Sequence, residues 1–127
     1  MDPKTNAINW FEICVSDMNR AKTFYETVFD IKMEVMDMMG MKMAGFPYEP
    51  MGGKASGALV QGEMHKPGMD GTIIYLNANP DLAPALSRVE KAGGKLLMPK
   101  TQITPEIGYM AFFVDTEGNR MAMHSQN

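Results

Sequence analysis

The chain has 127 residues, of which 45% are hydrophobic and 21% are charged. This length is typical of one domain of roughly 100–200 residues, and it excludes enzymes that need a separate substrate domain. The formal net charge is −3, from 12 Lys+Arg and 15 Asp+Glu. A mildly acidic chain with no basic run lacks the electrostatic footprint of a nucleic-acid binder.

Membrane and secretion signals are also missing from the sequence. No stretch approaches the ~18 apolar residues of a membrane span, and the N-terminal residues lack the apolar segment of a signal peptide. The single cysteine, Cys14, cannot form a disulfide within the chain and excludes cysteine-rich zinc sites. We therefore expect a cytoplasmic protein with no membrane partner and no nucleic-acid partner.

The first half of the chain alternates between strand and helix patterns. Asp17 is a candidate helix N-cap, and the apolar residues after it recur at helical spacing. Gly40 supplies the positive φ that a hairpin turn at Met39-Gly40 needs. The predicted elements are a strand at 8–15, a helix at about 18–29, a hairpin of 31–38 with 41–46, and a strand at 57–63.

The second half repeats this order of elements. Asn79-Pro80-Asp81 predicts a helix start with a cap and a proline at the first helical position, and Gly93 predicts its end. A loop containing Pro99 and Pro105 follows a short strand. The predicted strands lie at 72–78, about 95–98, about 108–114 and 120–124.

The pattern β-α-β-β-β thus occurs twice, which predicts an α+β fold of two paired modules. The modules cover about 8–63 and 72–124, and a linker of turn residues at 64–71 joins them within one domain, 1–127.

Several local strings, in this order and spacing, resemble the vicinal-oxygen-chelate superfamily, which includes glyoxalase I, extradiol dioxygenases and bleomycin-resistance proteins. The chain is most similar to its small, single-domain, lactoylglutathione-lyase-related members. The strings are Phe11-Glu12-Ile13 with Val15-Ser16-Asp17, Arg20-Ala21 with Phe24-Tyr25, Val89-Glu90-Lys91-Ala92-Gly93-Gly94-Lys95, Gly108-Tyr109-Met110-Ala111-Phe112-Phe113 and Asp115-Thr116-Glu117-Gly118-Asn119. The resemblance implies a curled mixed sheet around a cavity, helices on its outer face, and a homodimer.

Metal-dependent members of this family hold an ion with four side chains that point into the cavity. Carried over one at a time, these positions fall on Trp10, Ile73, Ala122 and, at best, Gln61. Three of the four cannot coordinate a metal, whereas a catalytic divalent site normally has three or more protein donors. We therefore expect that the inherited metal site is lost, with no metal and no cofactor.

Strand alternation predicts which side chains line the cavity. Trp10 and Tyr75 would form flat apolar walls with one polar group each, and Asn77, Gln61 and Arg120 would orient a ligand. In the alternative interpretation, these side chains fill the concave face and leave no cavity. The full set of predicted ligand-binding residues is Trp10, Cys14, Gln61, Tyr75, Asn77, Arg120, Met41 and Met43.

Two residues keep the cavity-facing parity and carry acid–base chemistry, Glu12 and His124. Together they predict a catalytic pair; alternatively, Glu12 is a partly buried structural carboxylate and His124 a frayed terminal side chain. His65 lies among Pro and Gly in the linker and is expected to be exposed to solvent. Cys14 has no adjacent basic residue to lower its pKa, which favours an inert side chain.

The chain also contains 15 methionines, six of them from Met33 to Met43. Methionine is typical of adaptable binding surfaces. About half of those in the predicted hairpin would line an apolar pocket wall, or else form a soft core under the first helix. Met121 and Met123 face the helix side of the last strand and are predicted to be core residues.

Three functions remain open from the sequence. The first is a metal-free protein that binds a small apolar or aromatic compound. The second is a lyase- or isomerase-type enzyme that uses Glu12 with His124 or Tyr75, or a metal held by a non-inherited ligand set. The third is an interaction domain without pocket chemistry.

Overall fold

The computed structural model describes all 127 residues, and the chain folds into two modules with the same order of elements. The first module consists of β1 (Trp10–Cys14), α1 (Met18–Phe29), β2 (Val35–Met38), β3 (Met41–Gly45) and β4 (Ser56–Gln61). The second consists of β5 (Tyr75–Asn77), α2 (Ala83–Ser87), β6 (Lys95–Thr104), β7 (Gly108–Val114) and β8 (Arg120–Ser125). The predicted α+β fold with a repeated β-α-β-β-β order is confirmed.

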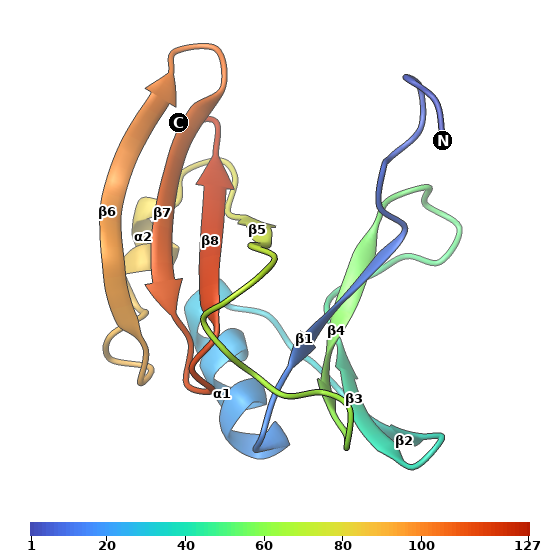
Figure 1. The fold of residues 1–127 in the computed structure, drawn as a ribbon. Coiled ribbons are helices and arrows are strands. Elements are labelled where there is room, and N and C mark those ends of the chain that lie inside the picture. The colour runs from blue at the N-terminus through green and yellow to red at the C-terminus, as the bar shows by residue number, and fades with distance from the viewer.

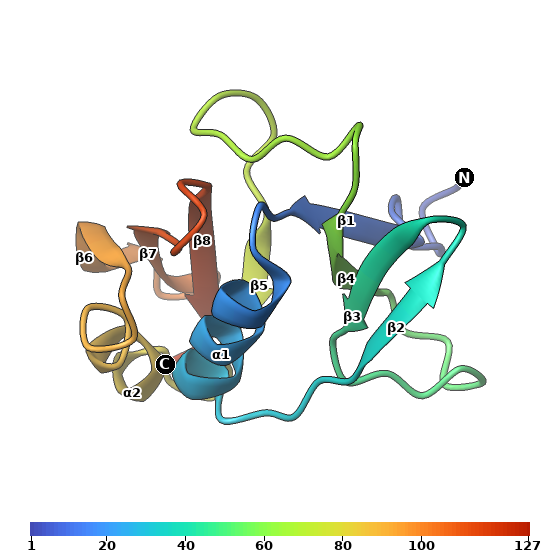
Figure 2. The ribbon, with the colours of Figure 1, turned by 90° about the horizontal axis from the view of Figure 1, so that it is seen from below.

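Each module contributes one four-stranded mixed sheet. The strand orders are β1-β4-β3-β2 in sheet A and β5-β8-β7-β6 in sheet B, and the first strand of each module runs parallel to its last. The two sheets stand side by side (Figure 1), and both helices lie on one side of them while the chain between β4 and β5 crosses the other side (Figure 2). Each sheet therefore has a helix-covered face and an open face.

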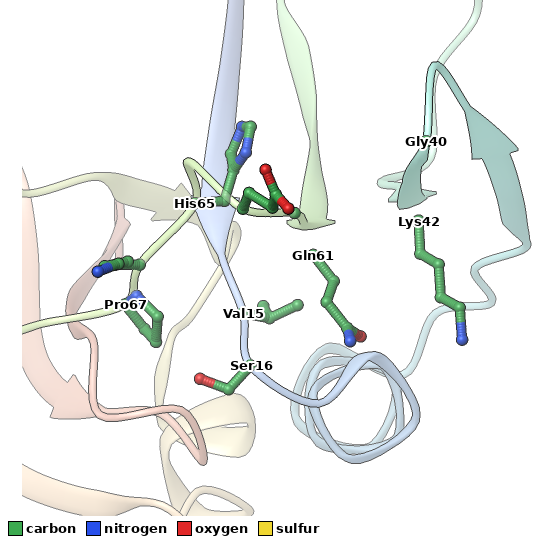
Figure 3. A pocket seen from close by; sticks show the side chains of 10 residues that line it. Val15, Ser16, Gly40, Lys42, Gln61, His65 and Pro67 are labelled. Carbon is green, nitrogen blue, oxygen red and sulfur yellow. The ribbon is translucent and has the colours of Figure 1, made fainter.

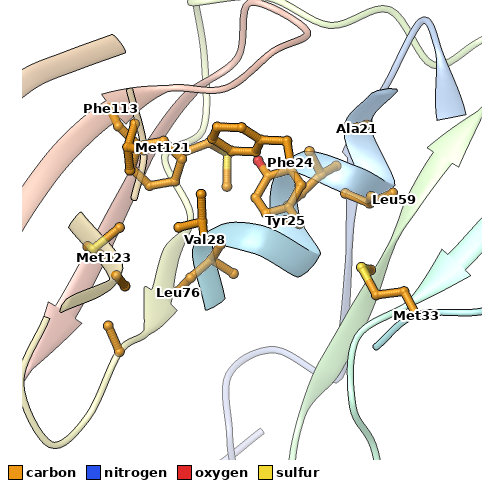
Figure 4. Packing of buried hydrophobic residues seen from close by; sticks show 14 of the residues in the cluster. Ala21, Phe24, Tyr25, Val28, Met33, Leu59, Leu76, Phe113, Met121 and Met123 are labelled. Carbon is orange, nitrogen blue, oxygen red and sulfur yellow. The ribbon is translucent and has the colours of Figure 1, made fainter. Parts of the chain in front are cut away.

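Helix α1 occupies the predicted residues because its sequence supplies both a cap and an apolar stripe. The Asp17 side chain accepts a hydrogen bond from the Arg20 amide. Phe24 and Val28 lie on the buried stripe, and Phe24 packs against Phe113 of β7 with ring centroids 6.1 Å apart (Figure 4). Helix α1 thus joins the cores of both modules, and burial of each large side chain contributes about 1.5–3 kcal/mol. No helix of the structure has the length and apolar character needed to cross a membrane.

The turn between β7 and β8 holds the start of α1. The Glu117 Oε1 atom accepts hydrogen bonds from the Ser16 and Asp17 amides, both at 2.8 Å, and Arg20 Nε donates to Glu117 Oε2 at 2.7 Å. Buried Tyr25 donates its hydroxyl to Asp115 Oδ2 at 2.7 Å. A turn of the second module therefore clamps the first helix of the first module, and we call these contacts the inter-module clamp.

Three predicted elements of the second module differ from the structure. Strand β5 has only three residues. Helix α2 has five residues and no side-chain cap, because its N-cap residue is Leu82; the proline in its first turn is Pro84, and Pro80 lies before the helix. Strand β6 runs for ten residues through Pro99 instead of ending before it. An edge strand accommodates a proline where its pairing is interrupted, and the pairing of β6 with β7 shifts between Met98 and Thr101.

The predicted hairpin turn is confirmed, although β2 begins only at Val35. Met39 and Gly40 both adopt positive φ, 54° and 81°, as the tight two-residue turn of a hairpin requires. Met121 and Met123 are buried in the core beneath the helices, as predicted.

Candidate functional site

The open faces carry most of the side chains that the sequence predicts for a cavity. Trp10, Glu12 and Cys14 project from β1 on the open face of sheet A, since Ile13 on the opposite face is buried in the core. On sheet B, Tyr75 and Asn77 of β5 stand beside Ala122 and His124 of β8. Trp10 is 43% and Tyr75 48% exposed, so neither aromatic ring is enclosed by the fold.

Gln61 does not belong to this set, and the prediction that it faces the cavity is wrong. In β4 it shares a face with Leu59, which is buried against α1. Its Oε1 atom accepts a hydrogen bond from the Met18 amide at 2.9 Å, which satisfies a free donor at the helix start. In Figure 3 its side chain points toward α1 while His65 points away.

One cleft lies between the two modules and has a volume of about 360 Å³. Glu12 and Cys14 line it from β1, Arg120 lines it from β8, and Lys66 and Asp70 line it from the linker. Three predicted site residues are therefore brought together, and the linker forms part of the wall.

The linker reaches Glu12 through His65, and this contact contradicts the expectation that His65 is exposed to solvent. His65 Nε2 donates to Glu12 Oε1 at 2.8 Å; the His65 side chain is half-buried, and the Glu12 side chain is exposed. The other ring nitrogen, Nδ1, is buried without a hydrogen-bond partner. Because 53 residues separate the two in sequence, only the path of the linker reveals the pair.

Polar residues, His65 among them, line a second hollow of about 470 Å³ (Figure 3). Ser16, Lys42, Gln61 and His65 are among its walls, and Val15 is the one hydrophobic residue. This hollow suits an apolar molecule poorly.

The open face of sheet B contains a third hollow, also of about 470 Å³, whose walls are more apolar. The Tyr75 ring packs edge-on against Phe112 with centroids 5.8 Å apart, and His124 Nε2 donates to the Ile107 carbonyl oxygen at 2.7 Å. The hollow is lined by Tyr75, Asn77, Asn79, Ile103, Ile107, Met110 and His124. His124 is thus held in place rather than frayed.

The structure does not bring the predicted catalytic residues Glu12 and His124 together. Glu12 lies in the cleft between the modules with His65, and His124 lies in the hollow of sheet B with Tyr75. Each histidine has its own hydrogen-bond partner, so the two residues belong to two separate sites.

Arg120 and Cys14 share the cleft but have different chemistry. Arg120 Nη2 donates to the Gly71 carbonyl oxygen at 3.4 Å, and its Nε atom is buried without a partner. Burial raises the pKa of the Cys14 thiol, and the Glu12 carboxylate raises it further. Cys14 is therefore a protonated thiol near neutral pH and a weak nucleophile.

The methionines of the β2–β3 hairpin gather on one face. Met36 pairs with Met43 and Met38 pairs with Met41, and directly paired side chains project to the same side of a sheet. Met43 also pairs with Val60, which pairs with Cys14, so this is the open face of sheet A. Of the hairpin region's methionines, only Met33 is buried under α1.

The four inherited ligand positions lie on different segments of the fold. Trp10 lies on the open face of sheet A, Ala122 is buried beside Tyr75, and Ile73 precedes β5. Gln61 is on the helix-covered face. No group of three His, Cys, Asp or Glu side chains is close enough to hold a metal ion.

Comparisons with known proteins point to one family. The family model described as glyoxalase/bleomycin resistance protein/dioxygenase superfamily matches residues 7–123. No curated protein matches the chain in sequence.

Solved structures share the fold at low identity. TnmS3, an antibiotic-binding protein from Streptomyces sp. CB03234, has 22% identity and a TM-score of 0.68, covering 99% of this chain and 100% of its own. A glyoxalase/bleomycin resistance protein from Albidiferax ferrireducens T118 has 15% identity and a TM-score of 0.70, with 96% and 100% covered. A glyoxalase I mutant from Zea mays has 18% identity and a TM-score of 0.65, and the match covers 93% of this chain but 45% of that one.

Proposed function

Because the chain belongs to the glyoxalase/bleomycin resistance protein/dioxygenase superfamily, we propose that it binds a small apolar or aromatic molecule and has lost the inherited metal site. The observation that carries this proposal is the hollow on the open face of sheet B. Tyr75, Ile103 and Ile107 line it with apolar surface that remains exposed in the folded chain.

The walls of this hollow match the usual composition of a ligand pocket, mostly apolar with a few polar groups that set orientation. Asn77 and His124 supply the polar groups. The Tyr75 ring offers aromatic surface for stacking, since the residue is 48% exposed. TnmS3, an antibiotic-binding protein that shares the fold, supports the binding of a small molecule.

A thermal-shift screen with small aromatic compounds tests the proposal. A ligand that binds only the folded chain raises the unfolding temperature in proportion to its concentration over its Kd. We expect hits, and we expect Ile107→Ala and Tyr75→Ala to weaken them. Leu97→Ala is the matched control, because Leu97 is an exposed apolar residue of the same sheet that does not line the hollow. Equal losses in all three variants would contradict the assignment.

A second candidate function is proton transfer of the lyase or isomerase type. The observation that favours it is the Glu12–His65 hydrogen bond of 2.8 Å in the cleft beside Arg120. Glu12 would take a proton from a carbon next to a carbonyl group, the electron pair moving onto the carbonyl oxygen, and would return that proton to the substrate. The predicted partners His124 and Tyr75 lie in the other site, so His65 is the better partner.

Deuterium exchange separates the two candidates. A panel of 2-oxo acids and hydroxyketones is incubated with the protein in D₂O, and exchange at the carbon next to the carbonyl is followed by NMR. Exchange that Glu12→Gln abolishes and Glu63→Gln leaves unchanged would favour the enzyme. No exchange with any compound would favour simple binding.

We also propose a homodimer in the cytoplasm, as the family resemblance implies. Sedimentation equilibrium of the full chain tests the oligomeric state, and a mass of one chain at all concentrations would contradict it.

A further inference from the structure

We propose that four methionines of the β2–β3 hairpin form a binding site for a soft monovalent cation, Cu(I) or Ag(I). The residues are Met36, Met38, Met41 and Met43, and we call them the methionine face. This site is distinct from the proposed ligand hollow on sheet B and from the four inherited metal positions.

The pairing of the two strands creates the site. Met36 lies directly opposite Met43, and Met38 lies directly opposite Met41. Side chains in such pairs start about 4.5–5.5 Å apart at their Cβ atoms. A methionine side chain has three rotatable bonds, so the sulfurs of two adjacent pairs can converge without a change in the backbone.

The backbone of the hairpin fixes this register. The turn at Met39 and Gly40 has positive φ at both residues, which is the geometry of a two-residue loop. A slip of one residue would turn every side chain to the other face. The four thioethers are therefore held on one face by the fold, and their grouping is not an accident of flexible loops.

The methionine face is accessible to an ion. Met36 is 55% and Met38 46% exposed, and Met41 and Met43 are half-buried. The hairpin forms an edge of the molecule, away from sheet B (Figure 2). A thioether that served only as core filler would be buried like Met33 under α1.

The chemistry of the donors selects the ion. Thioether sulfur is a soft, uncharged ligand, and soft ligands select Cu(I) over hard cations that need carboxylate or carbonyl oxygen. The opposite face of the hairpin carries the pair Asp37 and Lys42, whose charges offset each other. Neutral sulfur ligands favour a cation of low charge, because a divalent ion would leave more charge uncompensated.

Cys14 lies on the same open face but outside the site. Val60 separates it from Met43 in the strand order, and its thiol pKa is raised by burial and by Glu12. Since a thiol also binds Cu(I), the experiment uses Cys14→Ser as the background for every variant.

The test is a competition for Cu(I) against bicinchoninate, followed by the loss of colour of the Cu(I) complex under anaerobic conditions. On the Cys14→Ser background we expect about one Cu(I) per chain. Met36→Leu with Met43→Leu keeps apolar volume but removes two sulfurs, and we expect roughly tenfold weaker binding or more. Met38→Leu with Met41→Leu should weaken Cu(I) binding to the same degree. With two variants, the test still works if one of them fails to fold.

The matched control removes two other exposed methionines, Met51→Leu with Met64→Leu. These are 96% and 93% exposed and lie outside any strand. If this control weakens Cu(I) binding as much as the hairpin variants do, the metal binds exposed methionines without a site, and the proposal fails. It also fails if the Cys14→Ser chain takes up no Cu(I).

A second readout uses Ag(I), which has no redox chemistry under these conditions. In protein labelled with ¹³C at the methionine methyl groups, we expect Ag(I) to shift four signals together, assigned by the leucine variants. Shifts that include the buried Met121 or Met123 but not the hairpin would overturn the proposal. Because the readout needs no apolar ligand, its outcome is independent of the function proposed for sheet B.

Discussion

The two modules share one order of elements, yet their open faces differ in chemistry. Sheet A presents thioethers together with the exposed Glu12, which accepts a hydrogen bond from His65 of the linker. Sheet B presents a hollow with the aromatic ring of Tyr75 and the side chains of Ile103 and Ile107. A repeated topology therefore fixes where side chains are displayed but not what they do. The two modules therefore differ in the kind of ligand that their open faces can bind.

The helices differ just as much, and this difference predicts where stability resides. Helix α1 has 12 residues and packs on both sheets, whereas α2 has five. Phe24→Ala in α1 should lower the free energy of unfolding by about 3–5 kcal/mol. Leu86→Ala in α2 should cost less, because Leu86 is at the margin of the core and its short helix can adjust. Urea denaturation of both variants tests the comparison, and equal losses would contradict it.

Loss of the inter-module clamp should have the next largest effect on the free energy of unfolding. Glu117→Ala removes the acceptor of the Ser16 and Asp17 amides at the start of α1, and loss of such a capping acceptor costs about 0.5–2 kcal/mol. Thermal unfolding at neutral pH measures it. Glu63→Ala is the control, since Glu63 is an exposed carboxylate with no such partner. An unchanged midpoint for Glu117→Ala would show that the clamp contributes nothing.

The clamp also predicts a pH dependence. Burial acts to raise the pKa of Glu117, but hydrogen bonds from Arg20 and from the Asp17 and Ser16 amides outweigh it, so the pKa lies below its usual value of 4.5. A depressed folded-state pKa gives stability that is present above the unfolded pKa and is lost as pH falls through the folded one. The difference between wild type and Glu117→Ala should therefore shrink below about pH 4.5. A constant difference down to pH 3 would contradict this assignment.

Local sequence signals predicted the parts of the fold that local physics determines. The bounds of α1 follow from the Asp17 cap and the apolar stripe, and the hairpin turn follows from Gly40. The length of β6 did not follow, because Pro99 normally ends a strand and only its place at a sheet edge makes it tolerable. Whether a strand continues through a proline depends on which strands lie beside it. A short stretch of sequence does not contain that information.

The candidate sites show the same limit. Strand parity correctly placed Trp10 and Tyr75 on the open faces, but it failed for Gln61 because its face depends on the register of β4 with β1. The Glu12–His65 contact joins residues 53 positions apart through a linker without periodic structure. Strand parity predicts to which face of a strand a side chain points. It does not predict which residues of a neighbouring loop contact that side chain.

The linker provides the most direct link between the two modules, and its loss of a contact has the smallest predicted effect on stability. It bonds Glu12 of the first module through His65, and the Gly68 amide donates to Asn119 Oδ1 of the second at 2.9 Å. A half-exposed pair contributes at most about 1 kcal/mol, so His65→Asn should barely change the free energy of global unfolding. Local opening is governed by different contacts, so amide hydrogen exchange in the linker should accelerate on loss of His65.

The change in amide exchange distinguishes two roles for the Glu12–His65 pair. If Glu12 and His65 hold the linker against the cleft, exchange should accelerate around Gly68 in His65→Asn while the amides of β7 and β8 stay as protected as in the wild type. Glu12→Gln retains an acceptor for His65 and should change exchange less than His65→Asn does. If exchange at Gly68 is unchanged in both variants, the Asn119 contact alone fixes the linker, and the Glu12–His65 pair is free to serve the chemistry of the cleft.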